Sequence, residues 1–206
     1  MDGDKPFSEK HELYRLSSTK ELCKTYHAST SRTVSVFGNI DYEKANVSKN
    51  RAGFGQLKYS RPEIEAVEMF MKKQYKVKVY DGAKATEYAF RSLSDRSPAI
   101  LHISSHGEYK GDNKTNEDEA MEMSVLVLAG SNQTDKSQDE DGYVSAADVA
   151  SMNLRQCDMA VLSACYTGVG GQGTDGIFGL QRGFKNAGVH TLLMSLKSVS
   201  DEATCE

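Results

Sequence analysis

The stretch Asp158-Met-Ala-Val-Leu-Ser-Ala-Cys165 contains the pattern that decides the fold. Its run of apolar residues is typical of a strand buried on both faces, as in parallel sheets covered by helices on either side. A second stretch of the same kind, Pro98-Ala-Ile-Leu-His-Ile-Ser104, leads into His106-Gly107. Each of these two strands therefore ends next to a residue with a reactive side chain, a cysteine in one and a histidine in the other.

Strands and helices alternate along the rest of the chain. Further strands are predicted over residues 33–40, 77–80, 124–129 and 190–195, which are rich in β-branched and other apolar residues. This alternation predicts an α/β protein whose mostly parallel sheet is covered on both faces. In such sheets ligands bind outside the carboxyl ends of the strands, where His106 and Cys165 are expected to lie.

Three helix starts are indicated by capping residues. Ser60-Arg-Pro-Glu63 has the pattern of a capping box with Pro in the first turn, and Ser145-Ala-Ala-Asp148 has the pattern of a second one. Thr174 is the expected cap of a third helix, which Gly188 ends. The expected apolar faces are Ile64, Val67, Phe70 or Met71, and Tyr75 in the first helix, and Ile177, Leu180, Phe184 and Ala187 in the third.

The composition excludes several classes of protein. The 206 residues are 38% hydrophobic, enough to bury the core of one large domain, and the net charge of −4 argues against a nucleic-acid partner held by charge. No apolar run approaches the roughly 20 residues of a membrane helix, and the N-terminus lacks a signal-peptide pattern. The four cysteines form no close pair, which favours a reducing cytoplasm. We therefore expect a cytoplasmic protein without a membrane or nucleic-acid partner.

The acidic residues are concentrated between the two reactive residues. Residues 108–141, an acidic insertion, contain ten acidic and three basic residues, a net charge of −7. The strand over 124–129 divides the insertion into two polar arms, 108–123 and 131–141, which are expected to be loops near the same sheet edge. The arms are either solvated loops or segments that gate the site or are cut during activation. The candidate cleavage positions are Lys110, Lys114 and Lys136.

Cys165 and His106 together suit covalent catalysis by a thiol. A cysteine peptidase needs a thiolate, a base that takes the thiol proton, and N–H donors for the oxyanion of the tetrahedral intermediate. In this interpretation Cys165 is the nucleophile, His106 is the base, and backbone N–H groups of Gly107 and Cys165 are the donors. Spacing alone leaves open that Cys165 is a small buried hydrophobe and His106 an ordinary loop histidine.

The sequence around both residues resembles the CHAT family of caspase-like proteases, which are often fused to TPR repeats. The two matching phrases are Ile100-Leu-His-Ile-Ser-Ser-His-Gly107 and Val161-Leu-Ser-Ala-Cys-Tyr-Thr-Gly168. The similarity continues in the family's order through Asp175-Gly-Ile-Phe-Gly-Leu-Gln-Arg-Gly-Phe-Lys-Asn-Ala-Gly188 and Ser195-Leu-Lys-Ser-Val-Ser-Asp-Glu-Ala-Thr204. Shorter matching phrases lie at 82–87 and 141–143, so the resemblance extends over residues 33–206.

The resemblance implies a three-layer α/β/α caspase–hemoglobinase-like fold with a mostly parallel central sheet. It also implies a cysteine endopeptidase that cleaves a protein or peptide substrate through a thioester, with His106 and Cys165 as the catalytic dyad and no cofactor. Residues 1–32 would lead in from an upstream region, and residues 33–206 would be the domain without its C-terminal part. An attached sensor or TPR segment would activate the enzyme in a bacterial signalling or defence pathway.

Three residues are candidates for substrate binding. Asp201 matches the acid that, in the related separases, lines the pocket for an arginine side chain, which a carboxylate binds through paired hydrogen bonds. The alternative is that Asp201 is an ordinary acid near a helix N-terminus. Lys197 replaces the family's Trp and changes the expected lining of the substrate groove, and Ser163 stands where the caspase phrase has Gln.

Three competing interpretations remain. The Gly-rich loop 168–173 satisfies the G-x-G-x-x-G spacing of dinucleotide-binding loops, but no acid follows at the end of the next strand. His102 and His106 are four residues apart, which on a strand separates them by about 13 Å, so no metal site is expected and His102 is more naturally a core or supporting residue. The third alternative is a caspase-like scaffold or interaction module without turnover.

Overall fold

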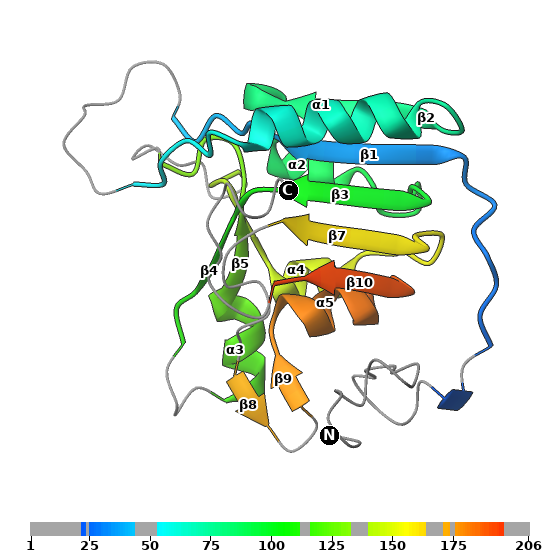
Figure 1. Cartoon of the computed structure of the whole chain (residues 1–206). Coiled ribbons are helices and arrows are strands. Elements are labelled where there is room, and N and C mark those ends of the chain that lie inside the picture. The colour runs from blue at the N-terminus through cyan, green and yellow to red at the C-terminus, as the bar shows by residue number, and fades with distance from the viewer. Residues whose placement is uncertain are drawn as a thin grey trace, which may run out of the picture.

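The computed structural model describes residues 22–23, 25–43, 53–111, 116–132, 140–163, 171–173 and 176–195. At its centre lies a five-stranded sheet with the strand order β10-β7-β3-β1-β2 (Figure 1). Its strands are β1 (Thr33–Gly38), β2 (Lys76–Asp81), β3 (Ile100–Ser104), β7 (Met159–Ser163) and β10 (Thr191–Met194). Every pair of neighbouring strands in this sheet is parallel.

Helices cover both faces of the sheet, so the predicted three-layer α/β/α arrangement is confirmed (Figure 1). The helix α1 (Ser60–Met71) packs on one face, and α2 (Glu87–Arg91), α4 (Ala146–Ser151) and α5 (Leu180–Asn186) lie on the other. None of the helices in the described ranges is long and apolar enough to cross a membrane.

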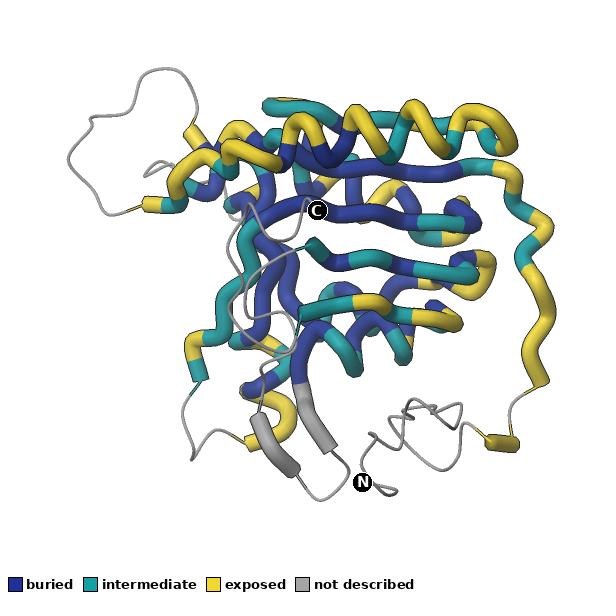
Figure 2. Tube along the Cα trace, viewed as in Figure 1, coloured by how far each residue is buried: buried dark blue, intermediate teal, exposed yellow. Residues whose placement is uncertain are grey.

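The alternation of side chains along β1 explains the two layers of core. Val34 and Val36 pack with Ile64 of α1, whereas Phe37 belongs to the larger cluster on the other face. Phe37 stacks on Tyr80 at a centroid distance of 4.2 Å and meets Phe90 edge-on at 5.9 Å. Because successive side chains of a strand point to opposite faces, one strand contributes to both cores. Figure 2 shows that the central strands β1 and β3 are mostly buried, whereas the edge strand β10 is partly exposed.

A smaller antiparallel sheet, with the order β4-β5-β6, follows directly from β3. Its strands are β4 (His106–Tyr109), β5 (Ser124–Val127) and β6 (Tyr143–Ser145), with α3 (Glu117–Met123) between the first two. The remaining elements are a 3₁₀ turn, η3 (Gly82–Lys84), and the hairpin β8 (Gly171–Gly173) and β9 (Gly176–Phe178). The chain passes from β3 into this second sheet at His106, so the position of His106 is fixed by the start of β4.

The predicted capping box at Ser60 is wrong, although a helix does begin there. Tyr59 occupies the N-cap position of α1 and makes no side-chain capping bond. The Ser60 hydroxyl instead accepts a hydrogen bond of 2.7 Å from the backbone N–H of Asn39, and Glu63 is turned into the interior. Ser60 and Glu63 therefore form hydrogen bonds with residues distant in sequence instead of capping the helix.

The apolar face of α1 is confirmed with one exception. Ile64, Val67, Met71 and Tyr75 pack together, whereas Phe70 is 67% exposed.

The other two predicted helix starts have opposite outcomes. The capping box of Ser145 and Asp148 is present in both directions at the start of α4. The third helix begins at Leu180 rather than after Thr174, which lies outside the described residues, because Ile177 belongs to β9. Gly188, with a φ of +100°, follows the end of this helix as predicted.

The arm 108–123 is not the loop that the charge pattern indicated. Its first residues belong to β4, and α3 follows after the undescribed residues 112–115. Asn116 and Glu119 form a capping box at the start of α3, and Ala120 is buried. The acidic residues in the first turn of α3 stabilise its N-terminus, so their charge reflects helix formation rather than a solvated loop. Lys114, Lys136 and most of the arm 131–141 lie outside the described residues.

The described part of the N-terminal segment runs beside the amino ends of β7 and β10 (Figure 1). The ring of Tyr26 stacks on His190 at 3.5 Å, and the backbone N–H of Ser29 donates to Asp158 at 2.9 Å. The backbone N–H of Thr30 donates to the Gln156 side chain at 2.9 Å. Residues 25–32 form no helix; we call this extended segment, which is hydrogen-bonded to Gln156 and Asp158 just before β7, the N-terminal strap.

Candidate active site at the junction of two sheets

His106 lies at the corner where the chain leaves the parallel sheet and joins the antiparallel one. The backbone N–H of Ser105 donates to the Ser163 carbonyl at 3.1 Å, which extends the pairing of β3 with β7 by one residue. The Ser105 hydroxyl donates to the carbonyl of Val127, the residue that faces His106 in the pairing of β4 with β5. The backbone at His106 is therefore held by both sheets.

The imidazole ring of His106 is oriented by the segment around Gly55. Its Nε2 lies 2.7 Å from the carbonyl oxygen of Gly55. A carbonyl can only accept a hydrogen bond, so Nε2 carries the proton and Nδ1 of the neutral ring is the nitrogen that can accept one. The rings of Tyr42 and Phe54 flank the imidazole at centroid distances of 5.1 and 5.3 Å. This arrangement is the one that a general base needs.

A buried polar cluster lies under α1, next to the carboxyl ends of β3 and β7. The Oε1 of Glu63 is 2.9 Å from Nε2 of His102, and its Oε2 accepts a hydrogen bond of 2.6 Å from the Ser104 hydroxyl. Burial raises the pKa of Glu63, but the hydrogen bonds from His102, Ser104 and, as a smaller effect, Ser163 outweigh it and hold the pKa below its ordinary value. We infer that Glu63 is an ionised carboxylate that ties α1 to β3.

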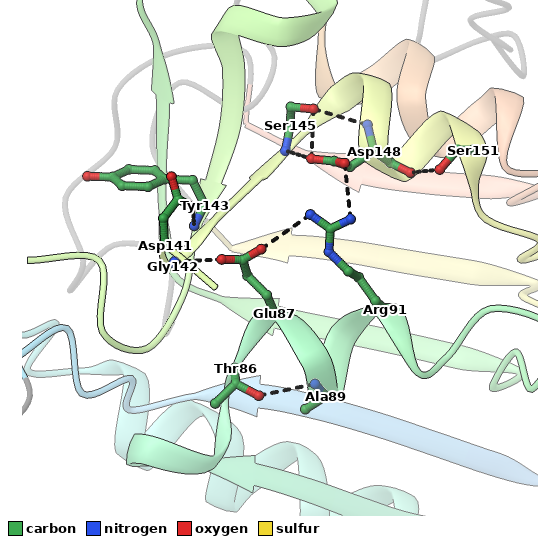
Figure 3. A network of polar contacts seen from close by, with 10 residues as sticks. All are labelled: Thr86, Glu87, Ala89, Arg91, Asp141, Gly142, Tyr143, Ser145, Asp148 and Ser151. Atoms are coloured by element: carbon green, nitrogen blue, oxygen red, sulfur yellow. Dashed lines mark hydrogen bonds and ion pairs between the residues drawn. The ribbon is translucent and has the colours of Figure 1, made fainter. Parts of the chain in front are cut away.

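A second buried carboxylate supports the turn before β6 (Figure 3). Glu87 accepts a hydrogen bond of 2.6 Å from the backbone N–H of Gly142 and one of 3.2 Å from Arg91. Arg91 also contacts Asp148 at 3.2 Å, which links α2 to α4. Tyr143 follows Gly142 directly, and its ring meets Phe54 at 6.2 Å beside His106. By binding Gly142, Glu87 therefore helps to position Tyr143, whose ring contacts Phe54 next to His106.

We expect Glu87→Gln to keep the stability near neutral pH within about 1 kcal/mol, whereas Glu87→Ala should lower it by about 1–3 kcal/mol. Burial raises the pKa of Glu87 in the folded protein above its ordinary value. The stability gained from the protonated carboxyl is therefore fully present below the ordinary pKa of a Glu side chain and is lost as the pH rises through the raised pKa. Glutamine removes this pH dependence and still accepts from Gly142. Urea unfolding at about pH 4 and about pH 8 checks the prediction, and an equal loss in both variants would contradict it.

The structure describes three of the predicted site residues. His106 and Gly107 are the first two residues of β4, and Ser163 is the last residue of β7. Cys165, Lys197 and Asp201 lie outside the described residues. Ser163, two residues before Cys165, pairs with Ser104, two residues before His106.

The two histidines of the metal interpretation have different partners. His102 contacts Glu63, whereas His106 contacts Gly55. No group of three or more metal-ligating side chains occurs within the described part of the chain. His102 lies buried inside β3, as its place in the predicted strand indicated.

Sequence reasoning missed the partners of the histidine. Residues 41–59 resemble an ordinary loop in sequence, and Tyr42, Phe54 and Gly55 carry no motif that joins them to His106. The glycines at 53 and 55 were the available signal, because glycine permits a close approach of backbone to its neighbours. The capping pattern predicts that Glu63 lies at the helix start, whereas the apolar neighbour Ile64 indicates that this side of the helix faces the core.

The five-stranded parallel sheet flanked by helices, with a histidine two residues after the end of the central strand β3, is consistent with a caspase-like α/β fold. The model of the CHAT domain family matches residues 1–206, the whole chain, so the chain belongs to the CHAT family of caspase-like domains. A comparison with curated proteins finds no match.

Proposed function

We propose that this protein is a cysteine endopeptidase in which Cys165 is the nucleophile and His106 the general base. The observation that carries the proposal is the hydrogen bond of 2.7 Å between Nε2 of His106 and the carbonyl of Gly55. This bond orients Nδ1 as the proton acceptor in a protein of the CHAT family. The equal spacing of His106 and Cys165 from the paired residues Ser104 and Ser163 supports their assignment to one site.

The reaction begins when Nδ1 of His106 takes the proton of the Cys165 thiol. The thiolate attacks the peptide carbonyl carbon, and the N–H groups of Gly107 and Cys165 would stabilise the oxyanion. As the C–N bond breaks, His106 returns the proton to the leaving amine, and a thioester remains on Cys165. His106 then takes a proton from water, whose oxygen attacks the thioester carbon. As the C–S bond breaks, the acid product leaves and His106 returns the proton to the Cys165 sulfur.

The proposed substrate is a protein or peptide, recognised in part by Ser163, Lys197 and Asp201. Of these, Ser163 is half-buried at the end of β7, where it pairs with Ser104 of β3. An activating sensor or TPR segment, and a cytoplasmic signalling or defence role, belong to the same proposal. The alternative, a scaffold without turnover, is separated from it by the experiment that follows.

Labelling with a peptide-based, thiol-reactive electrophile is expected to modify Cys165 before the other cysteines. Cys157 is buried, and burial raises its pKa to about 12, so it holds almost no thiolate at neutral pH. Cys23 is exposed and serves as the internal control for an ordinary thiol. The measurement is peptide mapping by mass spectrometry after labelling at about pH 7 and about pH 9.

The same labelling in the Cys165→Ala and His106→Ala variants completes the test. The peptidase proposal predicts that Cys165 reacts faster than Cys23 only when His106 is present. Equal rates at Cys23 and Cys165 in the unmodified protein would favour the scaffold. Substantial labelling of Cys157 at about pH 7 would show that the hydrophobic core around this residue opens in solution.

A further inference from the structure

We propose that Asn132 is a positioning residue that holds His106 in its catalytic orientation through the segment Phe54-Gly55. The inference rests on the proposed peptidase function, because it concerns the base of that reaction. Asn132 lies five residues after the end of β5, and among the described residues its hydrogen bonds do not reach the imidazole, Gly107 or Ser163. Its contacts instead reach the two residues whose rings flank the imidazole.

The side-chain amide of Asn132 binds both backbone groups of Phe54. Its Oδ1 accepts from the Phe54 N–H at 2.9 Å, and its Nδ2 donates to the Phe54 carbonyl at 2.9 Å. Since the backbone N–H can only donate and the carbonyl can only accept, the orientation of the amide is determined. The amide thus pairs with Phe54 as a neighbouring strand would, and the next carbonyl along the chain, that of Gly55, accepts from His106.

The other flanking residue is held by the backbone of Asn132. The Asn132 N–H donates to the carbonyl of Tyr42 at 2.9 Å, and the Gly130 N–H donates to Asp41 at 3.0 Å. One residue therefore fixes the backbone of both Tyr42 and Phe54. Displacing Asn132 would therefore free both flanking residues, Tyr42 and Phe54, to move away from the imidazole.

The close fit of Gly53 gives independent support. A Cβ atom at Gly53 would lie 2.6 Å from Oδ1 and 2.7 Å from Cγ of Asn132, well inside van der Waals contact. The absence of a side chain at this position is thus what allows the amide to reach Phe54. The substitution Gly53→Ala should push the amide away and reproduce the loss of Asn132.

The test compares Asn132→Ala, Asn132→Asp and Gly53→Ala with the control Asn153→Ala. Asn153 also makes two polar contacts through its side chain, to Asp95 at 2.7 Å and to the Arg155 N–H at 3.4 Å, but on the surface and away from His106. We expect kcat/KM for fluorogenic tetrapeptides ending in Arg, Lys, Asp or Leu to fall about 10- to 100-fold in the three variants, mainly in kcat. The control should stay within about twofold of the unmodified protein.

The aspartate variant separates hydrogen bonding from packing. Asp has the size of Asn but cannot donate to the Phe54 carbonyl, so its second oxygen faces another oxygen. Asn132→Asp should therefore behave like Asn132→Ala. Activity of Asn132→Asp equal to that of the unmodified protein would overturn the proposal, because it would show that the amide donor has no role.

Nitrogen NMR of the histidine ring provides a readout that does not depend on turnover. At about pH 8.5, above the pKa of free imidazole, the His106 signals should show the Nε2–H tautomer in the unmodified protein and in Asn153→Ala. In Asn132→Ala and Gly53→Ala the Nε2–H proton should lose its hydrogen bond to the Gly55 carbonyl, so its signal should move upfield and its exchange with water should become faster. An Nε2–H signal with unchanged position and exchange rate would overturn the role of Asn132, whatever the activity. If the unmodified protein cleaves none of the peptides, the peptidase proposal loses its support and the NMR comparison still decides the role of Asn132.

Discussion

The variant His106→Ala is expected to lower kcat/KM for the tetrapeptide substrates on the order of 10²–10⁴-fold. Without the imidazole whose Nε2 is held by Gly55, no oriented base takes the thiol proton or returns it to the leaving amine. The deficit should narrow as the pH rises past about 8.5, the ordinary pKa of a thiol, because the thiolate then forms without a base. Steady-state kinetics from about pH 6 to about pH 10 measure both effects.

His27→Ala is the matched control for this experiment. His27 is exposed in the N-terminal strap, far in sequence from the candidate site, and its removal should change kcat/KM less than about twofold. A His106→Ala enzyme with full activity would contradict the assignment of the base. A deficit of equal size at every pH would contradict proton abstraction from the thiol as the step that His106 assists.

The variant Glu63→Ala is expected to lower the free energy of unfolding by about 3–5 kcal/mol. Glu63 is only 8% exposed, and its carboxylate accepts from His102 and Ser104 at 2.9 and 2.6 Å. Alanine leaves these buried polar groups without their acceptor and opens a cavity under α1. Because the cluster joins α1 to β3 beside the candidate site, activity should fall together with stability. Urea unfolding followed by circular dichroism measures the change.

Glu65→Ala provides the control on the same helix. Glu65 pairs with Arg61 at 3.1 Å, but both side chains are largely exposed, so the change should be at most about 0.5 kcal/mol. If Glu63→Ala lowered the free energy of unfolding no more than Glu65→Ala does, the buried cluster would make no contribution to stability.

The pH dependence of Glu63 has a definite sign. Its pKa is held below the ordinary value, about 4.3, so its contribution is present above that value and is lost as the pH falls through the lowered one. The difference in stability between the unmodified protein and Glu63→Gln should therefore be largest near neutral pH and decrease in acid. A difference that grows in acid would contradict the ionised state of Glu63.

The layers of the fold were predictable because their signals are local and repeated. The apolar runs that became β3 and β7 predicted buried parallel strands, and Ser145 with Asp148 predicted the start of α4 correctly. Ser60 has a similar pattern but a different outcome, since its hydroxyl accepts from Asn39. Local capping chemistry cannot foresee a competing tertiary partner, and the same limit applies to the helix expected after Thr174.

The candidate site was predictable only in its reactive residues. The phrases around His106 and Cys165 marked both residues, and the structure describes the first of them at the expected sheet edge. The residues that orient the imidazole, Gly55 and Asn132, act through backbone groups or bind them. Such contacts depend on how loops fold against one another, and no residue type or spacing in one sequence encodes them.

The corner at Ser105 and His106 also bears on the kinetics of folding. Its contacts come from separate parts of the chain, with Gly55 far before it and Val127 and Ser163 far after it. The pairing of β3 with β7 closes a longer loop than that of β4 with β5, and closing long loops costs entropy and slows folding. We therefore expect the imidazole to reach its final orientation late in folding. In a chain still emerging from the ribosome, His106 would already be present but would not yet be oriented as a base.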